Sequence, residues 1–227
     1  MKPDNVNVAV ARSVGVIASA ADLRRACRLR RLPDLFELRL DAISVSADEL
    51  EAAIAMLRAP FIATARHPAE GGANNLSSAK RRALLLQFVL HAQYVDVELR
   101  AVTALERVLR EAARLNIKRI VSVHDLRRTP SAREIAALAA RAVEASADVF
   151  KLVTRVDTAA DLERLIAAFE LLKTQLPVSA MGVGKLGRKS RAELIARGSV
   201  LNYGHLGAAV ADGQFSLAEV RRLMRTR

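Results

Sequence analysis

The sequence predicts a single-domain (β/α)8 barrel over residues 1–227. Strand-like and helix-like segments alternate along the chain, this alternation repeats eight times, and successive strands begin 21 to 34 residues apart. That spacing leaves room for a parallel crossover through a helix. The chain is compact for a fold that typically has about 250 residues. An open doubly wound sheet is the alternative, although no Gly-x-Gly-x-x-Gly sequence follows the first predicted strand.

The predicted strands are short runs rich in β-branched and apolar residues. They cover residues 14–19, 35–41, 60–66, 94–99, 118–124, 148–156, 177–181 and 200–203. Residues 1–12 precede the first strand, and we expect them either to cover the bottom of the barrel as a strand or to be mobile.

Helix starts are indicated by the sequence Ser-x-x-Glu, in which the two side chains cap the first turn reciprocally. This sequence begins at Ser46, Ser131, Ser190 and Ser216, and Thr158 is a further capping residue. With the apolar periodicity, these signals predict helices over 21–30, 46–58, 77–92, 103–116 and 158–173, and others that begin near 131, 190 and 216.

Composition limits the function classes. The formal net charge is +12, but basic residues are spread along the helices and aromatic residues make up only 4%. We therefore expect no specific nucleic-acid binding, which sub-micromolar affinity for duplex DNA at physiological salt would contradict. The sequence has no apolar run of membrane-spanning length and no signal-peptide pattern near its start, so we expect a cytoplasmic protein without membrane contact. The single Cys27 has no metal-ligand spacing around it.

Lys151 is the most informative residue. The chain has seven lysines and 29 arginines (36 basic residues minus seven), so a lysine between Phe150 and Leu152 in an apolar run is unusual. Burial disfavours the ammonium form, and a neutral amine is a nucleophile toward carbonyl groups. The alternative is a lysine at a strand end whose side chain reaches water. From this segment alone, both interpretations remain open.

Further polar residues lie near the ends of other predicted strands, where (β/α)8 barrels hold their active sites. The candidates are Glu37, Arg39, Asp41, Arg66, Glu70, Asp96, Glu98, His124, Asp125, Arg191 and Gln214. Glu37 and Arg39 alternate with leucines and are expected to point into the barrel. The competing interpretations are an ion-pair network of Glu37, Arg39, Asp96 and Glu98, and a buried, hydrogen-bonded structural role for His124. Met181 is interpreted as a core residue.

The combination of these segments resembles type I 3-dehydroquinate dehydratase. The similarity is found in residues 37–41, 64–72, 94–98, 122–130, 150–151, 179–182, 190–191 and 211–214. It implies a (β/α)8 barrel that forms a homodimer, uses no cofactor or metal, and binds the small anionic substrate 3-dehydroquinate.

The resemblance also implies residue roles. Lys151 corresponds to the lysine that forms an imine with the C3 ketone of the substrate. His124 corresponds to the general base that removes the C2 proton and then protonates the departing C1 hydroxyl, giving a syn elimination. Glu70 corresponds to the carboxylate that hydrogen-bonds this histidine, and Arg191 to the arginine that binds the substrate carboxylate. Residues that hold the ring hydroxyls correspond to Glu37, Arg39 and Arg66, and a residue of the closing loop to Gln214.

The closing loop departs from the family pattern. Val210 replaces a serine that contacts the substrate, and Asp212 replaces a proline. Two alternatives therefore remain. One is a class I aldolase that acts on a phosphorylated sugar, with Gly182–Gly187 as its phosphate site. The other is a catalytically impaired homologue that acts as a binding protein.

Overall fold

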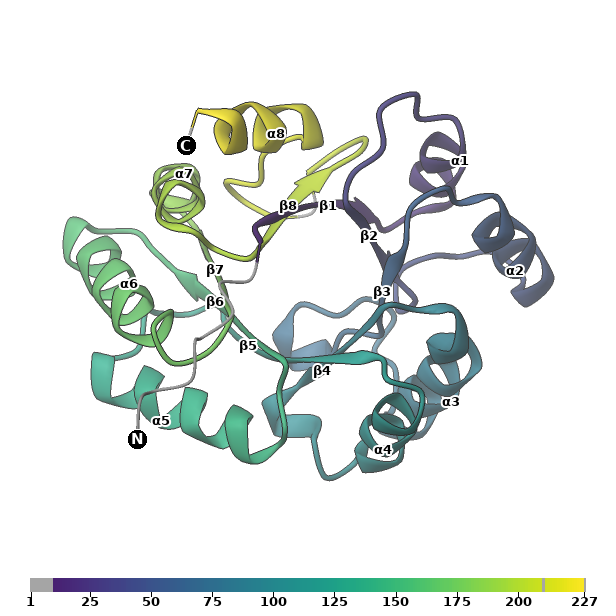
Figure 1. Ribbon diagram of the computed structural model, residues 1–227, viewed down its shortest axis with the longest axis horizontal. Helices are drawn as coiled ribbons and strands as arrows, with labels where there is room; N and C mark the ends of the chain where they lie inside the picture. The colour runs from purple at the N-terminus through teal and green to yellow at the C-terminus, as the bar shows by residue number, and fades with distance from the viewer. Residues whose placement is uncertain (1–9, 210, 227) are drawn as a thin grey trace.

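The computed structural model describes residues 10–209 and 211–226. Within these residues, eight parallel strands form one curved sheet, and eight α-helices surround it (Figure 1). The strands are β1 (Arg12–Ile17), β2 (Leu35–Arg39), β3 (Phe61–Thr64), β4 (Tyr94–Glu98), β5 (Lys118–Asp125), β6 (Val149–Arg155), β7 (Val178–Val183) and β8 (Leu201–His205). The α-helices are α1 (Ala20–Cys27), α2 (Ala47–Met56), α3 (Ser78–Phe88), α4 (Glu106–Arg114), α5 (Ala132–Glu144), α6 (Ala159–Leu172), α7 (Gly187–Arg197) and α8 (Leu217–Arg225). Three 3-10 helices are η1 (Pro68–Glu70), η2 (Val89–His91) and η3 (Leu99–Ala101).

The sheet order follows the chain and closes on itself. Each strand pairs with its neighbour in sequence from β1 to β7, and β1 also pairs with β8. Between β7 and β8, the Val200 amide donates to the Val178 carbonyl at 3.0 Å, and Ser179 Oγ donates to the Leu201 carbonyl at 2.7 Å. This topology confirms the predicted (β/α)8 barrel and excludes the open doubly wound sheet.

Three of the four predicted capping boxes are present. Ser46, Ser131 and Ser216 each accept a hydrogen bond from the backbone of the glutamate three residues later, and that glutamate binds back to the serine. Thr158 caps α6 in the same manner with Asp161. Because each box satisfies amides that the helix leaves unpaired, these helices begin where the sequence predicts.

The prediction that Ser190 begins a helix is wrong. Helix α7 begins at Gly187, and the Ser190 hydroxyl donates to the Gly187 carbonyl at 2.8 Å. An ideal Cβ on Gly182 would lie only 2.2 Å from Ser190 Oγ, so the glycine lets α7 approach β7 closely. Ser190 is therefore a packing residue within the first turn and not a cap.

Other helix boundaries also differ from the prediction. Helix α1 ends at Cys27, where the Arg28 amide bonds to the carbonyls of Ala26 and Arg25 and tightens the last turn. The segment predicted as 77–92 divides into α3 and η2, and the one predicted as 103–116 becomes helical only from Glu106. Helix ends often tighten into 3-10 turns when no cap fixes them.

Apolar residues fill the barrel interior and the space between the barrel and the helices. The interior layer contains Val14, Leu35, Ile62, Tyr94, Ile120, Val149, Leu201 and Tyr203. Two further clusters lie between the strands and the helix ring, and Leu38 and Leu40 belong to one of them. Glu37 and Arg39 alternate with these leucines, so their side chains face the inside of the barrel, as predicted.

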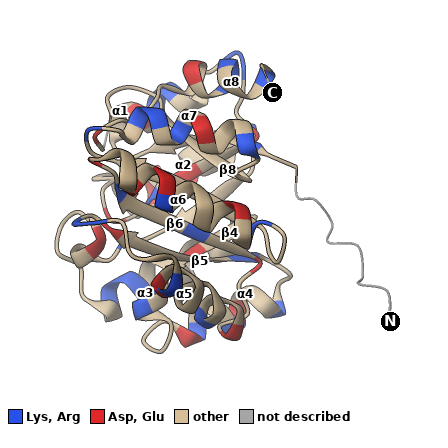
Figure 2. Ribbon diagram, turned by 90° about the vertical axis from the view of Figure 1, so that its left-hand side faces the viewer, with Lys and Arg blue, Asp and Glu red and all other residues tan. Residues whose placement is uncertain are grey.

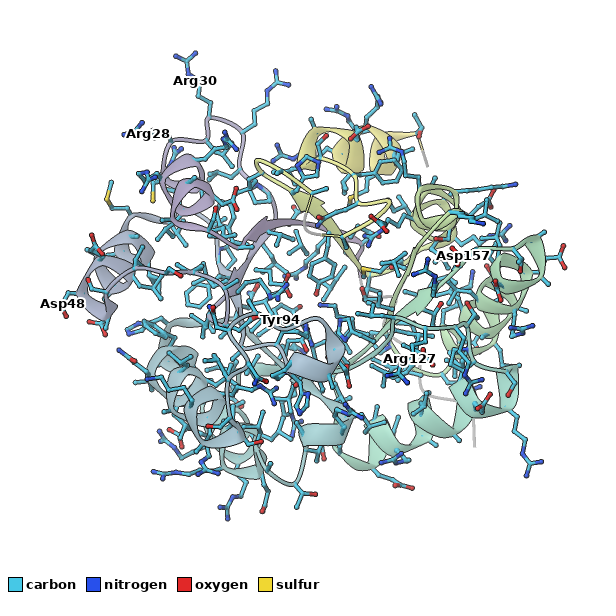
Figure 3. The ribbon with its side chains drawn as sticks, turned by 180° about the vertical axis from the view of Figure 1, so that it is seen from behind. Arg28, Arg30, Asp48, Tyr94, Arg127 and Asp157 are labelled. Carbon is cyan, nitrogen blue, oxygen red and sulfur yellow. The ribbon has the colours of Figure 1, made fainter. Side chains whose placement is uncertain are left out.

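Charged side chains lie mainly on the outer helices. Lysine, arginine, aspartate and glutamate residues are interspersed over the face shown in Figure 2. Arg28, Arg30 and Asp48 project away from the barrel, whereas Tyr94 lies near its centre (Figure 3). No helix among the described residues is long and apolar enough to cross a membrane. The hypothesis of a strand that covers the barrel bottom concerns mostly residues 1–9, which lie outside the described part.

Candidate active site

One cavity of about 140 Å³ lies at the carboxyl ends of the strands. A water molecule occupies about 30 Å³ in the liquid, so this volume suits a small molecule. Its lining includes the eight residues to which the family resemblance assigns a role: Glu37, Arg39, Arg66, Glu70, His124, Lys151, Arg191 and Gln214. Met181 and Tyr203 line it as well.

Lys151 projects from β6 into this cavity and is only 4% exposed. Its Nζ lies 2.9 Å from an Asp96 oxygen and 3.3 Å from a Glu37 oxygen. The interpretation of a side chain that reaches water is therefore wrong. Burial alone also gave an incomplete expectation of a neutral amine, because two carboxylates form ion pairs with this amine.

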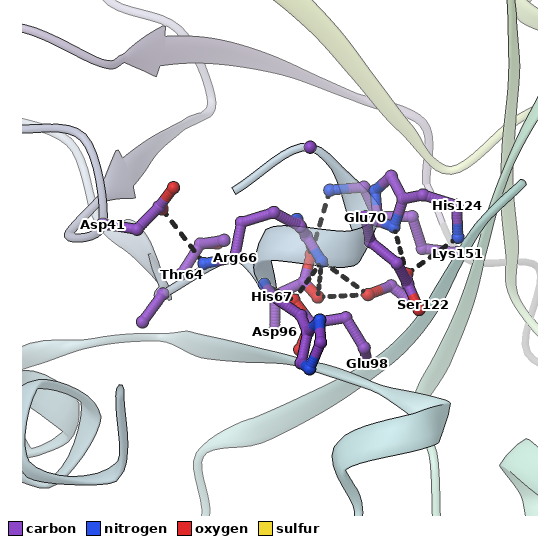
Figure 4. Close-up of polar contacts among 12 residues, drawn as sticks. Asp41, Thr64, Arg66, His67, Glu70, Asp96, Glu98, Ser122, His124 and Lys151 are labelled. Atoms are coloured by element: carbon purple, nitrogen blue, oxygen red, sulfur yellow. Dashed lines mark hydrogen bonds and ion pairs between the residues drawn. The ribbon is translucent and has the colours of Figure 1, made fainter. Parts of the chain in front are cut away.

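Arg66 holds these carboxylates in place from the end of β3 (Figure 4). Its guanidinium binds Asp96 through two hydrogen bonds of 3.1 and 2.7 Å, and it donates to Glu98 at 2.9 Å and to Ser122 at 2.8 Å. Burial would raise the pKa of Asp96, but the charges of Arg66 and Lys151 bring that pKa well below its ordinary value. Asp96 therefore stays ionised beside Lys151.

Arg81 extends this network beneath the cavity. This fully buried arginine of α3 forms an ion pair with Glu98 and donates from Nε to the Ala65 carbonyl at 2.6 Å. Three cations (Lys151, Arg66 and Arg81) thus oppose three anions (Glu37, Asp96 and Glu98). The predicted ion-pair network is confirmed for Glu37, Asp96 and Glu98, but it does not include Arg39, which pairs with Asp41 instead. Sequence analysis missed Arg81, and the only signal was its position four and seven residues before the apolar Leu85 and Phe88 on one helix face.

His124 and Glu70 form a second unit of the cavity wall. A Glu70 oxygen accepts the His124 backbone amide at 2.9 Å and lies 3.0 Å from Nδ1 of the same residue. Burial lowers the pKa of His124 well below its ordinary value, and the charges of Arg66 and Lys151 lower it further. The ring is therefore neutral. With Nδ1 engaged by Glu70, Nε2 is the ring nitrogen left to accept a proton.

Glu70 has a perturbed pKa of its own. Burial raises the pKa of this carboxyl group, the charge of Glu98 raises it further, and the result is about 7. Glu70 therefore changes its protonation near neutral pH. Such perturbed groups cluster at functional sites.

Arg39 connects the cavity to the loop that carries Glu70. Its guanidinium binds Asp41 through Nε and Nη2, at 2.9 and 2.8 Å, and donates to the Gly71 carbonyl at 3.1 Å. Asp41 also accepts the amides of Arg66 and Ala73. Burial would raise the pKa of Asp41, but these hydrogen bonds and the Arg39 charge lower it. Asp41 is therefore ionised and orders the β3–α3 loop.

Arg191 lies on the opposite wall and is 6% exposed. Its Nε donates to the Gly182 carbonyl at 3.0 Å, and Nη1 lies 3.5 Å from the Met181 sulfur. Burial lowers the pKa of Arg191 to about 10, so the guanidinium remains cationic at neutral pH. No carboxylate among the described residues forms an ion pair with it. Met181 is buried, as predicted, but it also contacts this guanidinium.

The loop between β8 and α8 completes the cavity. Gln214 is 7% exposed, and its backbone amide donates to the Ala211 carbonyl at 3.2 Å. Gly213 has a positive φ of 76°, a conformation that favours glycine. Asp212 is exposed, and Val210 lies outside the described residues. Among the residues that the structure describes, no group of three or more His, Cys, Asp or Glu side chains is arranged to hold a metal ion.

Comparison with known proteins identifies the family. The family model for type I 3-dehydroquinase matches residues 13–227. The chain belongs to this family. It is 32% identical over 208 residues to a 3-dehydroquinate dehydratase of Methanocella arvoryzae, which covers 91% of this chain and 92% of the relative.

Solved structures of the family share the fold. The type I 3-dehydroquinate dehydratase from Clostridium difficile aligns with a TM-score of 0.85 at 24% identity, over 96% of this chain and 93% of that chain. The enzyme from Enterococcus faecalis aligns with a TM-score of 0.82 at 28% identity, over 98% and 97% of the two chains. These findings support the predicted dehydratase over the aldolase alternative.

Proposed function

We propose that this protein is a hydro-lyase of the shikimate pathway that converts 3-dehydroquinate to 3-dehydroshikimate through an imine on Lys151. Family membership supports the reaction. The observation that supports the route is the meeting, in one small cavity, of a buried lysine, a neutral histidine held by Glu70, and the buried Arg191.

Arg191 binds the substrate carboxylate. A buried guanidinium that lacks an acidic partner is costly, and an anionic ligand removes that cost by supplying the missing charge. The planar guanidinium also matches a carboxylate in two-point geometry. Glu37, Arg39 and Arg66 hold the ring hydroxyls, and Gln214 closes the cavity from the β8–α8 loop.

The paired ammonium of Lys151 supplies all the protons that imine formation requires. One proton first moves from the ammonium to the C3 carbonyl oxygen, which frees the nitrogen lone pair to bond to the carbonyl carbon. A second proton then joins that oxygen, which departs as water, and the third proton remains on the cationic imine. The positive charge then withdraws electrons from the neighbouring C2–H bond. Lys151 thus acts both as the nucleophile and as the electron sink.

His124 completes the elimination. Its neutral Nε2 removes the C2 proton, and the C–H electrons form an enamine with the imine carbon. The enamine electrons then expel the C1 hydroxyl group, which takes the proton from His124 and departs as water. One residue serves both steps from one face, so the elimination is syn. Water finally hydrolyses the conjugated imine and restores the ammonium.

The assembly and location complete the proposal. We propose that the chain is a single catalytic domain and that it works as a cytoplasmic homodimer, as the family resemblance implies. Dispersed basic side chains support the absence of specific nucleic-acid binding. A monomeric mass by light scattering at micromolar concentration would contradict the homodimer.

Borohydride reduction in the presence of 3-dehydroquinate tests the imine. We expect substrate mass on the peptide that contains Lys151, and its loss in Lys151→Ala. The matched variant Lys118→Ala, at the opposite end of the barrel, should retain the adduct. Active protein with a label on another lysine, or with no label, would contradict the assignment. Turnover of a phosphorylated sugar in place of 3-dehydroquinate would favour the aldolase, and the absence of any turnover would favour the impaired homologue.

A further inference from the structure

Tyr203 contacts the amine of Lys151 through the face of its ring. The residue lies in β8, lines the same cavity and is 5% exposed. The Lys151 Nζ atom lies 4.1 Å from the centroid of the Tyr203 ring, well within the distance at which a cation is attracted to an aromatic face. Nothing in the proposed steps above uses this contact.

We propose that Tyr203 is a catalytic residue whose aromatic face stabilises the positive charge of the Lys151 imine. This inference rests on the proposed function. It gives a role to the contact between Lys151 Nζ and the Tyr203 ring. It also predicts that Tyr203 contributes more to turnover than to substrate binding.

The ammonium and the imine of Lys151 differ in their number of N–H groups. The ammonium has three, and it donates to both Asp96 and Glu37. The cationic imine has only one N–H, so it can direct a hydrogen bond to only one of these carboxylates. An aromatic face attracts a cation through its quadrupole and needs no N–H directed at it. The Tyr203 contact therefore persists when a carboxylate hydrogen bond is lost.

The hydroxyl group of Tyr203 has a different environment from the ring. Its oxygen is buried and has no hydrogen-bond partner among the described residues. Burial raises the pKa of Tyr203 well above its ordinary value, and the charges of Glu37 and Asp96 raise it further, so the phenol stays neutral. A buried hydroxyl without a partner costs stability. The ring, and not the hydroxyl, is therefore the part that supports Lys151.

Tyr94 provides a matched control. It is the only other tyrosine in the chain, it is 8% exposed, and it belongs to the same apolar interior layer. It lies near the barrel centre (Figure 3) but is not part of the cavity lining, and it pairs in register with Lys118 at the beginning of β5. Replacing Tyr94 thus removes a buried barrel tyrosine without removing the ring beside Lys151.

The test replaces Tyr203 with phenylalanine, a ring-fluorinated phenylalanine and leucine, and Tyr94 with leucine. Fluorination withdraws the negative charge of the ring face while nearly preserving its shape. We expect Tyr203→Phe to stay within about threefold of wild type in kcat, because the ring face is kept. The ring-fluorinated phenylalanine and the leucine at position 203 should each lower kcat about tenfold. KM should change little, and borohydride-trapped adduct at Lys151 should form more slowly in proportion. Tyr94→Leu should keep the wild-type kcat.

The possible results separate failure of the proposed function from failure of the role of Tyr203. If wild-type protein gives no adduct at Lys151, the proposed function fails and this inference fails with it. If wild-type protein gives the adduct but kcat is the same for phenylalanine and its fluorinated form, the inference alone is overturned. Should Tyr203→Leu not fold, the fluorinated series still decides, because it changes the charge of the ring face and not the packing.

Discussion

The arginines on the two sides of the cavity differ in whether a carboxylate pairs with them. On the β2–β5 side, Arg39 pairs with Asp41, and Arg66 pairs with Asp96 and Glu98. On the β7–β8 side, Arg191 is just as buried, yet no carboxylate among the described residues forms an ion pair with it. It instead contacts a backbone carbonyl and a thioether sulfur.

This difference separates two tasks. Charges that are fully paired within the protein cost little reorganisation, and they hold Lys151 and His124 in place before substrate arrives. A buried cation without an anion instead favours an anionic ligand. Losing an arginine from the paired side should therefore reduce stability, whereas losing Arg191 should reduce substrate binding.

The largest effect on stability is expected on the β2–β5 side, where the arginines pair with carboxylates (the paired side). Arg81→Met removes the cation beneath Glu98 and leaves that carboxylate with only part of its compensation, so the free energy of unfolding should fall by about 3 kcal/mol or more. Arg82→Met is the matched control, because Arg82 lies next to it in α3 at a partly exposed site and donates to the Ala104 carbonyl, with no ion pair to a described carboxylate. It should change the free energy by less than about 0.5 kcal/mol. Urea unfolding measures both, and equal values would refute the structural role of Arg81.

The second largest effect is expected in substrate binding on the β7–β8 side, where Arg191 lies (the unpaired side). Arg191→Met should raise KM for 3-dehydroquinate by roughly 10- to 1000-fold, because a charge-assisted two-point contact is lost. Its free energy of unfolding should stay within about 1 kcal/mol of wild type, since no carboxylate loses a partner. Steady-state kinetics and urea unfolding of the same preparation provide both numbers. An unchanged KM would remove Arg191 from the binding site.

The sequence predicted the fold and the end of the barrel that holds the site from local patterns, whereas the family resemblance selected the eight residues of the cavity. Alternating apolar residues specify which face of a strand points inward, and parallel strands bring their carboxyl ends to one edge. Glu37, Lys151 and His124 therefore meet although Glu37 and Lys151 are 114 residues apart. Capping signals located four of the eight α-helix starts for the same reason, since they operate within one turn.

The errors and omissions depend on contacts between elements. The close approach of α7 to β7 at Gly182, which changes the role of Ser190, has no local sign in the sequence. The pairing of Lys151 with two carboxylates, and its contact with Tyr203, follow from barrel closure. Arg81 was missed because its neighbours in sequence indicate a helix but not its partner Glu98.

The closing loop provides a third prediction, on the unpaired side. Val210→Ser supplies one hydroxyl where the family commonly has one, and Asp212→Pro removes an exposed negative charge and restricts the loop. A hydrogen bond contributes about 0.5–1.5 kcal/mol and the proline a similar amount, so the double variant should raise kcat/KM for 3-dehydroquinate by roughly 5- to 100-fold. The single variants show whether the gains add.

Steady-state kinetics that follow the conjugated enone of the product measure this gain. A double variant that folds normally but is no faster would mean that this loop closes in another way or over another ligand. That result would reopen the assignment of 3-dehydroquinate itself, because the loop contains the main departure from the family pattern.

The smallest expected effect is a pH response set on the paired side by Glu70. Below its pKa of about 7, the neutral carboxyl group keeps its proton and donates a hydrogen bond to His124 Nδ1, which places the ring proton on Nε2 and removes the base. The ratio kcat/KM should therefore fall about tenfold per pH unit below 7.

Two variants sharpen this prediction. Glu70→Gln has no ionisation in this range and can still accept from Nδ1, so its profile should be flat from pH 5.5 to 7.5 at a lower maximum. Asp125→Asn changes the residue next to His124 that bonds instead to the amides of Arg127 and Arg128, and it should keep the wild-type slope. A slope that survives in Glu70→Gln would assign the ionisation to another group. The paired side would then still position Lys151 and His124, but it would not control which nitrogen of His124 carries the proton.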